Sequence, residues 1–134
     1  MQAEDELWRQ ALIAQSRAYA PYSHFSVGAA LETEDGTIVL GANVENASYP
    51  LGCCAERSAV FAAVAQGYQH FKRLLLVGPG QDLIAPCGAC RQVLAEFGDF
   101  EVIMADSKKR VAPRVMRVSE LLPLQFGKED LNGV

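Results

Sequence analysis

Two cysteines stand side by side in the stretch GCCAERSAVFAAVAQG, which covers residues 52–67. A second pair, Cys87 and Cys90, follows in the motif PCGAC. If this pair begins a helix, the three-residue spacing places both sulfurs on one face, close enough to share a tetrahedral ion. Cys54 begins the preceding predicted helix, and the strand between the two helices can return the chain so that they are neighbours. The spacing therefore predicts a metal site of three thiolates, from Cys54, Cys87 and Cys90.

Glu56 follows Cys54 by two residues and is the candidate acid and base. Three protein ligands leave the fourth position of a tetrahedral zinc ion open, which is typical of catalytic sites. A carboxylate beside that position can take the proton of a water molecule and deliver it to a leaving group. Three thiolates also give the site a net negative charge. Arg57 and Arg91, in the first turns of the two helices, are therefore expected to donate hydrogen bonds to the sulfurs.

The cysteines alone leave other interpretations open. A Cys-x-x-Cys pair at a helix start also occurs in thiol–disulfide oxidoreductases and in structural zinc sites. A closed structural site would need Cys53 as its fourth ligand, but adjacent residues rarely aim both sulfurs at one ion. We expect Cys53 to be a small buried hydrophobe. The two histidines, His24 and His70, are expected at the surface or in loops, away from the metal.

Hydrophobic periodicity and turn signals predict the elements that position these residues. We expect helices at residues 4–19, 54–66 and 87–97, a helical turn after 118, and strands at 25–32, 37–43, 73–78, 100–105 and 111–118. The Asp-Gly pair between the first two strands indicates a hairpin. The order predicts an α/β fold, a three-layer α-β-α arrangement with a mixed five-stranded sheet. Helix N-termini gather at one end of such a sheet, where ligands bind.

Length and charge narrow the class of protein. The chain has 134 residues, which suits one domain with one sizeable core, and its formal net charge is −4. This acidic balance predicts no nucleic-acid partner, because binding to phosphates needs a basic surface. Apolar runs are all well short of the roughly 20 residues that a membrane span needs, so no membrane partner is expected. The acidic start MQAEDELWRQ lacks the features of a secretory signal, which predicts a cytoplasmic protein with reduced thiols.

Longer motifs resemble a known family. Cys54-Ala55-Glu56 and the later PCGAC match the signature of zinc-dependent nucleoside deaminases. The blocks YAPYSHFSVGAAL, NVENASYPLGCCAER, APCGACRQV and ELLPLQFGKEDL resemble the small homotetrameric cytidine deaminases. The similarity runs from about residue 19 to residue 131. It implies a cytidine deaminase-like fold, one catalytic domain over residues 1–134 and one Zn²⁺ per subunit. The implied reaction is hydrolysis of cytidine and deoxycytidine to uridine and deoxyuridine, in pyrimidine salvage.

The resemblance also implies roles for residues. Cys54, Cys87 and Cys90 would hold zinc, Glu56 would move protons, and Arg57 would support the thiolates.

Further residues are implied to contact the nucleoside. Phe25 would lie against the pyrimidine ring, Asn43 and Glu45 would bind the ribose, and the backbone N–H of Ala55 would meet the base carbonyl. The backbone carbonyl of Ala85 would face the leaving amino group.

Tyr49 and Phe126 are implied to complete the pocket of a neighbouring subunit, in a homotetramer with shared active sites. Structural alternatives exist for some of these residues, since Phe25 and Tyr49 also suit an apolar core, and Asn43 also suits a turn.

Three other functions compete with the one that the resemblance implies. The first is a deaminase of another aminopyrimidine nucleoside, such as the blasticidin type, against which the NVEN motif and Arg57 count. The second is a thiol–disulfide oxidoreductase that uses Cys87 and Cys90, which would leave Cys54 and Glu56 unexplained. The third is a noncatalytic zinc module that binds a partner.

Overall fold

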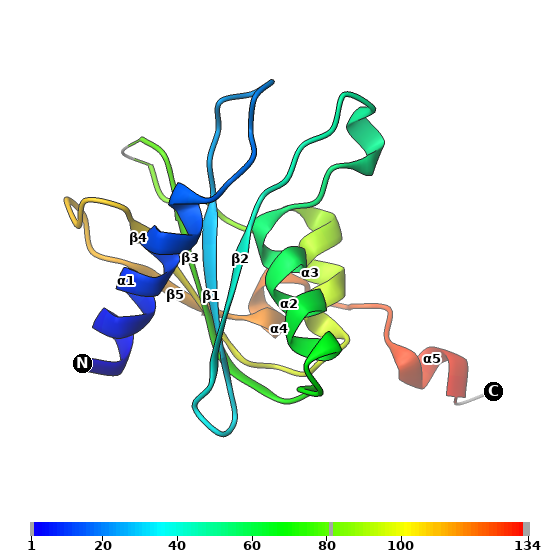
Figure 1. The fold of residues 1–134 in the computed structure, drawn as a ribbon. Coiled ribbons are helices and arrows are strands. Elements are labelled where there is room, and N and C mark those ends of the chain that lie inside the picture. Colours follow the sequence, from blue (N-terminus) through cyan, green and yellow to red (C-terminus); the bar gives the residue numbers. More distant parts are fainter. Residues whose placement is uncertain (1, 81, 133–134) are drawn as a thin grey trace.

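One five-stranded sheet, in the order β2-β1-β3-β4-β5, forms the centre of the computed structural model, which describes residues 2–80 and 82–132 (Figure 1). Strands β3 and β4 are parallel, and every other neighbouring pair is antiparallel. The expected mixed five-stranded sheet is therefore confirmed. The strands are β1 (Gly28–Thr33), β2 (Ile38–Ala42), β3 (Phe71–Gly78), β4 (Glu101–Asp106) and β5 (Arg114–Arg117).

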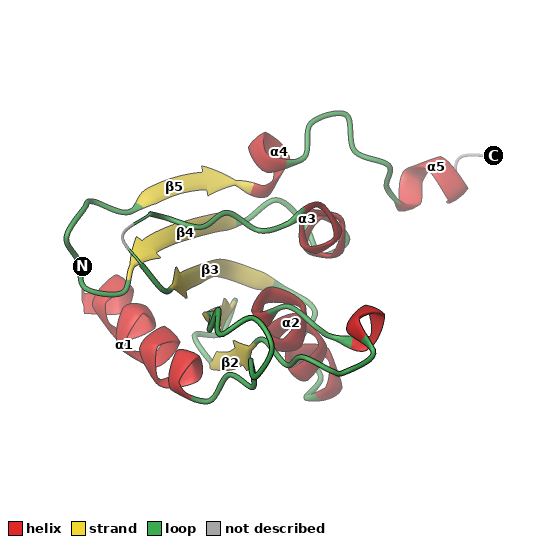
Figure 2. Cartoon of the chain, turned by 90° about the horizontal axis from the view of Figure 1, so that it is seen from above, coloured by secondary structure: helices red, strands yellow, loops and turns green. Residues whose placement is uncertain are grey.

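Helices cover both faces of this sheet, which confirms the three-layer prediction (Figure 2). Helix α1 (Gln2–Ser16) covers one face, whereas α2 (Ala55–Ala65), α3 (Gly88–Ala95) and the short α4 (Val118–Leu121) lie on the other. A 3₁₀ turn (Tyr49–Leu51) and a last helix, α5 (Lys128–Asn132), were not expected from the sequence. Figures 1 and 2 both show α5 standing away from the body of the molecule. No helix within residues 2–80 and 82–132 combines the length and the apolar character needed to cross a bilayer.

Strand β3 shows why the sequence builds two cores. Successive side chains of a strand point to opposite faces, so an uninterrupted apolar run serves both sides of a covered sheet. Leu74 and Leu76 belong to the core beneath α2 and α3, whereas Leu75 and Val77 belong to the core beneath α1. All four side chains are buried.

Of the element boundaries that differ from those expected, three have a local cause, which is a hydrogen bond or a proline; β3 also begins two residues early, at Phe71, and α3 ends two residues early, at Ala95. Helix α1 ends at Ser16 rather than at residue 19, because the backbone of Tyr19 pairs with Asn43 and Glu45. Strand β1 begins three residues later than predicted, since the side chain of Asn43 binds the backbone of the preceding segment. The last strand begins at Arg114, directly after Pro113, which has no N–H to give to the ladder.

Gly41 of β2 lies against the first turns of α2. A Cβ atom at this position would stand 2.3 Å from the carbonyl oxygen of Ala55 and 2.4 Å from the backbone nitrogen of Ala59. Both are backbone atoms, so a change of rotamer cannot relieve the contact. The missing side chain therefore lets α2 pack close to the sheet, and this packing fixes the helix start that carries Cys54 and Glu56.

Gly41→Ala is expected to lower the free energy of unfolding by about 2 kcal/mol or more, because α2 must move away from β2. Urea unfolding of the purified protein measures this change. Gly127→Ala is the matched control, since a Cβ there would meet only the mobile carboxylate of Glu129, 2.6 Å away at Oε1. Its stability should stay within about 0.5 kcal/mol of the wild type. Equal stability of the two variants would contradict the close packing.

Candidate active site

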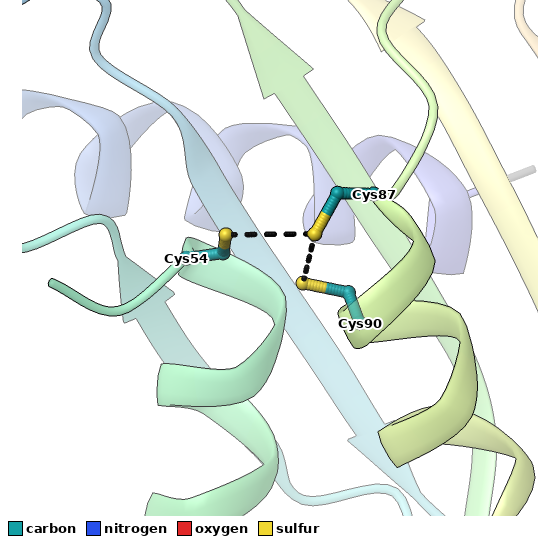
Figure 3. Close-up of side chains that lie close together, drawn as sticks. All are labelled: Cys54, Cys87 and Cys90. Atoms are coloured by element: carbon teal, nitrogen blue, oxygen red, sulfur yellow. Dashed lines mark hydrogen bonds between the residues drawn. The ribbon is translucent and has the colours of Figure 1, made fainter. Parts of the chain in front are cut away.

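Three cysteine sulfurs meet between the starts of α2 and α3 (Figure 3). The Sγ atom of Cys87 lies 3.9 Å from that of Cys54 and 3.4 Å from that of Cys90. All three sulfurs are within 4.8 Å of one another. A tetrahedral zinc ion with Zn–S bonds of about 2.3 Å would hold its sulfurs roughly 3.8 Å apart. The donor set and its spacing therefore fit a zinc ion with three protein ligands.

Two helix N-termini point their free N–H groups toward this three-cysteine cluster. Cys54 is the N-cap residue of α2, Cys87 is the N-cap residue of α3, and Cys90 lies in the first turn of α3. The unpaired N–H groups and the helix dipole stabilise negative charge at these positions. The local sequence thus supplies a partly electropositive setting for thiolates.

The thiols of α3 differ in their pKa values. Burial raises the pKa of Cys87, but the backbone N–H of Cys90 and the neighbouring thiols outweigh it, so the net shift is downward. Burial, followed by the charge of Glu56, raises the pKa of Cys90. Without a cation, Cys90 would stay protonated at neutral pH. A bound metal ion reverses this preference, because its charge stabilises the thiolate directly.

The two arginines have different partners. A guanidinium nitrogen of Arg57 lies 3.5 Å from the Sγ atom of Cys54, and this hydrogen bond raises the pKa of Arg57. Arg91 instead donates to two backbone carbonyls, those of Pro86 and Leu121. The expectation that Arg91 serves the sulfurs is therefore wrong, because its side chain turns back along the loop before α3.

Cys53 and the two histidines lie outside the cluster. Cys53 does not belong to any group of possible metal ligands within the described residues. It is partly rather than fully buried, since it lies on a segment whose backbone pairs with that of Val44, a residue that is itself half exposed. Burial raises the pKa of its thiol. His24 and His70 are exposed, as expected.

A cavity of about 390 Å³ opens beside the cluster. It brings together most of the residues that the sequence singled out, although these come from four separate parts of the chain. Its lining consists of Phe25, Val27, Asn43, Cys54, Ala55, Glu56, Ile84, Ala85 and Cys87. The sequence analysis did not single out Val27 and Ile84, because an apolar residue in a strand or loop carries no signal that separates a pocket wall from a core.

Glu56 reaches this cavity from the first turn of α2. Its side chain is buried, with 5% of its surface exposed, and burial raises the pKa of the carboxyl. Ala55, at the first position of the helix, is fully buried, and its N–H belongs to the turn whose donors have no partner within the helix. A proton carrier and a free donor thus lie next to each other at one wall.

Asn43 has a positioning contact with the segment that carries Phe25. Its Oδ1 atom accepts from the N–H of Val27 at 2.8 Å, and its Nδ2 atom donates to the carbonyl of Phe25 at 2.8 Å. The side chain therefore fixes the entry to β1 while it also lines the cavity. The structure gives Asn43 both the local role and a place in the candidate site.

Glu45 and Tyr49 lie around a second hollow, of about 300 Å³. Tyr22, Ser23, Asn46 and Gly52 complete its lining. Glu45 accepts from the N–H groups of Tyr22 and Ser23 and from the Ser23 hydroxyl, and the bonds from Ser23 do most to lower its pKa. Tyr49 packs its ring against that of Tyr22 and stays 75% exposed.

Phe126 does not reach the cavity of its own chain. It lies on the segment between α4 and α5, with 59% of its surface exposed. Its carbonyl accepts a hydrogen bond from the side chain of Gln92 at 2.8 Å. Within one copy of the chain, this aromatic side chain therefore has no contact with the candidate active site.

The sequence and the fold both match known proteins. Residues 1–106 match the family described as the cytidine and deoxycytidylate deaminase zinc-binding region. A cytidine deaminase of Sporosarcina psychrophila is 48% identical over 121 residues, which cover 89% of this chain and 88% of that protein. A cytidine deaminase of Mycobacterium tuberculosis is 44% identical over 118 residues, covering 88% of this chain and 85% of that protein.

Solved structures show the same agreement. The crystal structure of cytidine deaminase from Burkholderia pseudomallei has a TM-score of 0.86 and 48% identity, and the match covers 91% of this chain and 98% of that chain. The structure of cytidine deaminase from Mycobacterium tuberculosis has a TM-score of 0.77 at 41% identity, covering 92% and 96%. Zinc is the metal of the matched family, and the three-cysteine cluster is able to hold it.

Each of the single substitutions Cys54→Ser, Cys87→Ser and Cys90→Ser is expected to remove most of the zinc from the purified protein, because a hydroxyl is a much poorer zinc ligand than a thiolate. Elemental analysis after dialysis measures the metal content. Cys53→Ser is the matched control and should keep the zinc content of the wild type, since its sulfur lies outside the cluster. Loss of zinc from the Cys53 variant alone would overturn the ligand assignment.

Proposed function

Because the chain belongs to the cytidine and deoxycytidylate deaminase family, we propose that it hydrolyses cytidine and deoxycytidine with zinc as cofactor. The reaction consumes water, releases ammonia and gives uridine or deoxyuridine, which suits an enzyme of pyrimidine salvage. One observation carries the proposal, namely that the buried carboxylate of Glu56 lines the same cavity as Cys54 and Cys87. A closed structural metal site has no use for such a carboxylate.

Cys54, Cys87 and Cys90 are the residues that would hold the ion. When bound, zinc supplies a Lewis acid that generates a nucleophile from water at neutral pH. Glu56 takes the proton that this water loses and passes it to ring nitrogen N3 of the cytosine. The same carboxylate then takes a second proton, from the hydroxyl group that water has added at C4, and delivers it to the amino group, so that the C4–N bond breaks, ammonia leaves and a C4 carbonyl remains. The burial of Glu56, with 5% of its surface exposed, limits exchange of this proton with bulk water.

The remaining walls suit a flat aminopyrimidine. Phe25, Val27 and Ile84 supply apolar surface for the ring faces. The N–H of Ala55 is available to the base carbonyl, because the first N–H groups of a helix have no partner within it. The carbonyl of Ala85 is the candidate acceptor for the leaving amino group.

The chemistry of Asn43 suits the recognition of a ribose hydroxyl. Its amide uses one hydrogen on Phe25 and one lone pair on Val27, which leaves one donor and one acceptor. A hydroxyl group offers the complementary acceptor and donor. Glu45 retains acceptor capacity beyond its three bonds and is the second candidate ribose contact. These two residues favour a nucleoside over a free base.

The competing functions explain less of the site. A thiol–disulfide oxidoreductase needs only Cys87 and Cys90, yet Cys54 Sγ also lies 3.9 Å from that of Cys87. A noncatalytic zinc module accounts for neither the cavity nor Glu56. A deaminase of a different aminopyrimidine nucleoside would share the whole mechanism, and relative turnover on the two substrates distinguishes it.

We also propose a homotetramer in which neighbouring subunits share active sites. Tyr49 and Phe126 are large and exposed and do not line the cavity of their own chain, as expected for side chains that complete a neighbour's pocket. Residues 1–134 would act as one catalytic domain, supported by the single sheet that carries both cores. A cytoplasmic location is proposed because a site of three thiolates needs reduced cysteines. No nucleic-acid or membrane partner is proposed.

Glu56→Gln is expected to keep the fold and the zinc content while turnover of cytidine falls by about 10²-fold or more, because the amide cannot carry a proton. Ultraviolet absorbance follows the conversion of cytosine to uracil, and metal analysis is run on the same sample. Comparable turnover in the variant would remove Glu56 from the mechanism. A folded, zinc-loaded wild type that leaves cytidine unchanged would reject the proposed substrate.

At cytidine concentrations well below KM, co-expression of Glu56→Gln with Phe126→Ala is expected to give a higher rate than either parent alone. Each parent lacks one part of every pocket, and Phe126→Ala alone should raise KM roughly tenfold through lost contact with the substrate. A mixed tetramer contains pockets that take Glu56 from one chain and Phe126 from the other. Glu56→Gln with Phe25→Ala is the control, because both side chains line the cavity of one chain and cannot complement. Equal recovery in both pairs would contradict shared sites.

A further inference from the structure

Arg91 donates hydrogen bonds to the carbonyls of two consecutive residues, Pro86 and Cys87. Its Nε atom donates to the carbonyl of Pro86 at 2.8 Å, and its own backbone N–H donates to the carbonyl of Cys87 at 3.0 Å. The side chain and the main chain of one residue thus hold the last residue of the loop and the first cap of α3. The bond to Cys87 is the first main-chain bond of α3, whereas the bond to Pro86 depends on the arginine side chain and restrains the peptide group that joins Pro86 to Cys87.

The loop before α3 is held by side chains, including Leu83 and Ile84, which pack against the core, and not by its backbone. Within the part of the chain that the structure describes, the N–H and carbonyl groups of residues 82–86 form no hydrogen bond with another backbone group. Ile84 packs against Gly78, where an added Cβ would stand 2.9 Å from its Cδ1 atom. Pro86 is buried, so its carbonyl needs a partner inside the protein, and Arg91 supplies it. This loop also provides two walls of the cavity, Ile84 and Ala85.

The other end of the Arg91 bridge is fixed in the core. The guanidinium donates at 2.9 Å to the carbonyl of Leu121, the last residue of α4, whose side chain is buried. Helix α4 is itself held to the start of β4, because the N–H of Val118 donates to the carbonyl of Phe100 at 3.0 Å. Arg91 therefore connects the backbone of a loop that lacks backbone–backbone hydrogen bonds to a helix whose own backbone is bonded to the sheet.

We propose that Arg91 is a positioning residue for the metal site. Its side chain holds the Pro86 carbonyl against α4 and thereby keeps the Cys87 sulfur directed at the sulfurs of Cys54 and Cys90. A guanidinium suits this task because its planar fork donates in two fixed directions. A lysine ammonium has a single nitrogen on a flexible stem and would not hold both carbonyls in one geometry. The inference goes beyond the proposed function, since it concerns how the ion is held and not what is deaminated.

Arg91→Gln should release zinc to a chromogenic chelator about tenfold faster than the wild type, as outer residues that orient metal ligands typically affect affinity by 10- to 100-fold. The cobalt-substituted protein supplies a second measurement, because visible absorption of Co²⁺ reports the geometry of its thiolate ligands. The Arg91 variant should show altered cobalt bands. Neither measurement uses a nucleoside, so failure here is separate from failure of the proposed function.

Two control variants remove hydrogen bonds of α3 and α4 but leave the loop before α3, residues 82–86, unchanged. Arg117→Gln breaks the contact of the other end of α4 with Asp99, and Gln92→Ala breaks the bond from α3 to the carbonyl of Phe126. Both should keep the zinc-release rate and cobalt spectrum of the wild type, even if their melting temperatures fall. Equal effects in the Arg117 variant would show that Arg91 acts through general stability and would overturn the proposal.

Arg91→Lys keeps the positive charge and serves if Arg91→Gln does not fold. It should release zinc faster than the wild type, because one ammonium cannot replace the two-carbonyl bridge. A zinc-release rate and a cobalt spectrum unchanged in the folded Arg91 variants would equally reject a positioning role.

Discussion

The convergence of three sulfurs between two helix starts is the constraint on which the rest of the structure depends. Thiolates at these distances repel one another, and burial at Cys90 opposes ionisation further. Two helix N-termini, the guanidinium of Arg57 and a bound cation all act against this repulsion. Helices α2 and α3 must therefore lie side by side with their starts at one level, as Figure 3 shows for the residues involved.

Small residues satisfy this constraint for α2. Ala55, Ala59 and Ala63 lie on the buried side of the helix, and Gly41 of β2 lies against the first two of them. A larger side chain on either surface would lift the helix start and move Cys54 away from its partners. The alanine-rich composition that follows the paired cysteines is thus a packing requirement. It sets the distance between α2 and the sheet, and this distance determines where Cys54 and Glu56 lie.

Local patterns in the sequence were sufficient to predict the order of the strands and major helices along the chain, because the hydrophobic periodicity, the Asp-Gly turn and the cysteine spacing all reflect short-range structure. They were not sufficient for Arg91, whose partner Leu121 is 30 residues away and offers only a backbone carbonyl. The same limit applies to Glu45, because its bonds to Ser23 depend on how two loops meet. Residues 25–27 gave a strand pattern, but the side chain of Asn43 occupies their backbone groups instead.

The C-terminal segment links the metal site to the proposed assembly. Leu124, Phe126 and Leu131 expose apolar surface on a segment that leaves the body of the molecule, as Figure 1 shows, and covering such surface is favourable. Gln92, on the helix that carries Cys90, donates to the carbonyl of Phe126 in this segment, and its neighbour Arg91 donates to the carbonyl of Leu121 at the end of α4, where the segment begins. Any partner that covers the segment therefore acts on residues tied to α3. In the proposed assembly, a subunit that covers this segment would therefore lie against the helix that carries Cys90, through the bond from Gln92 to Phe126.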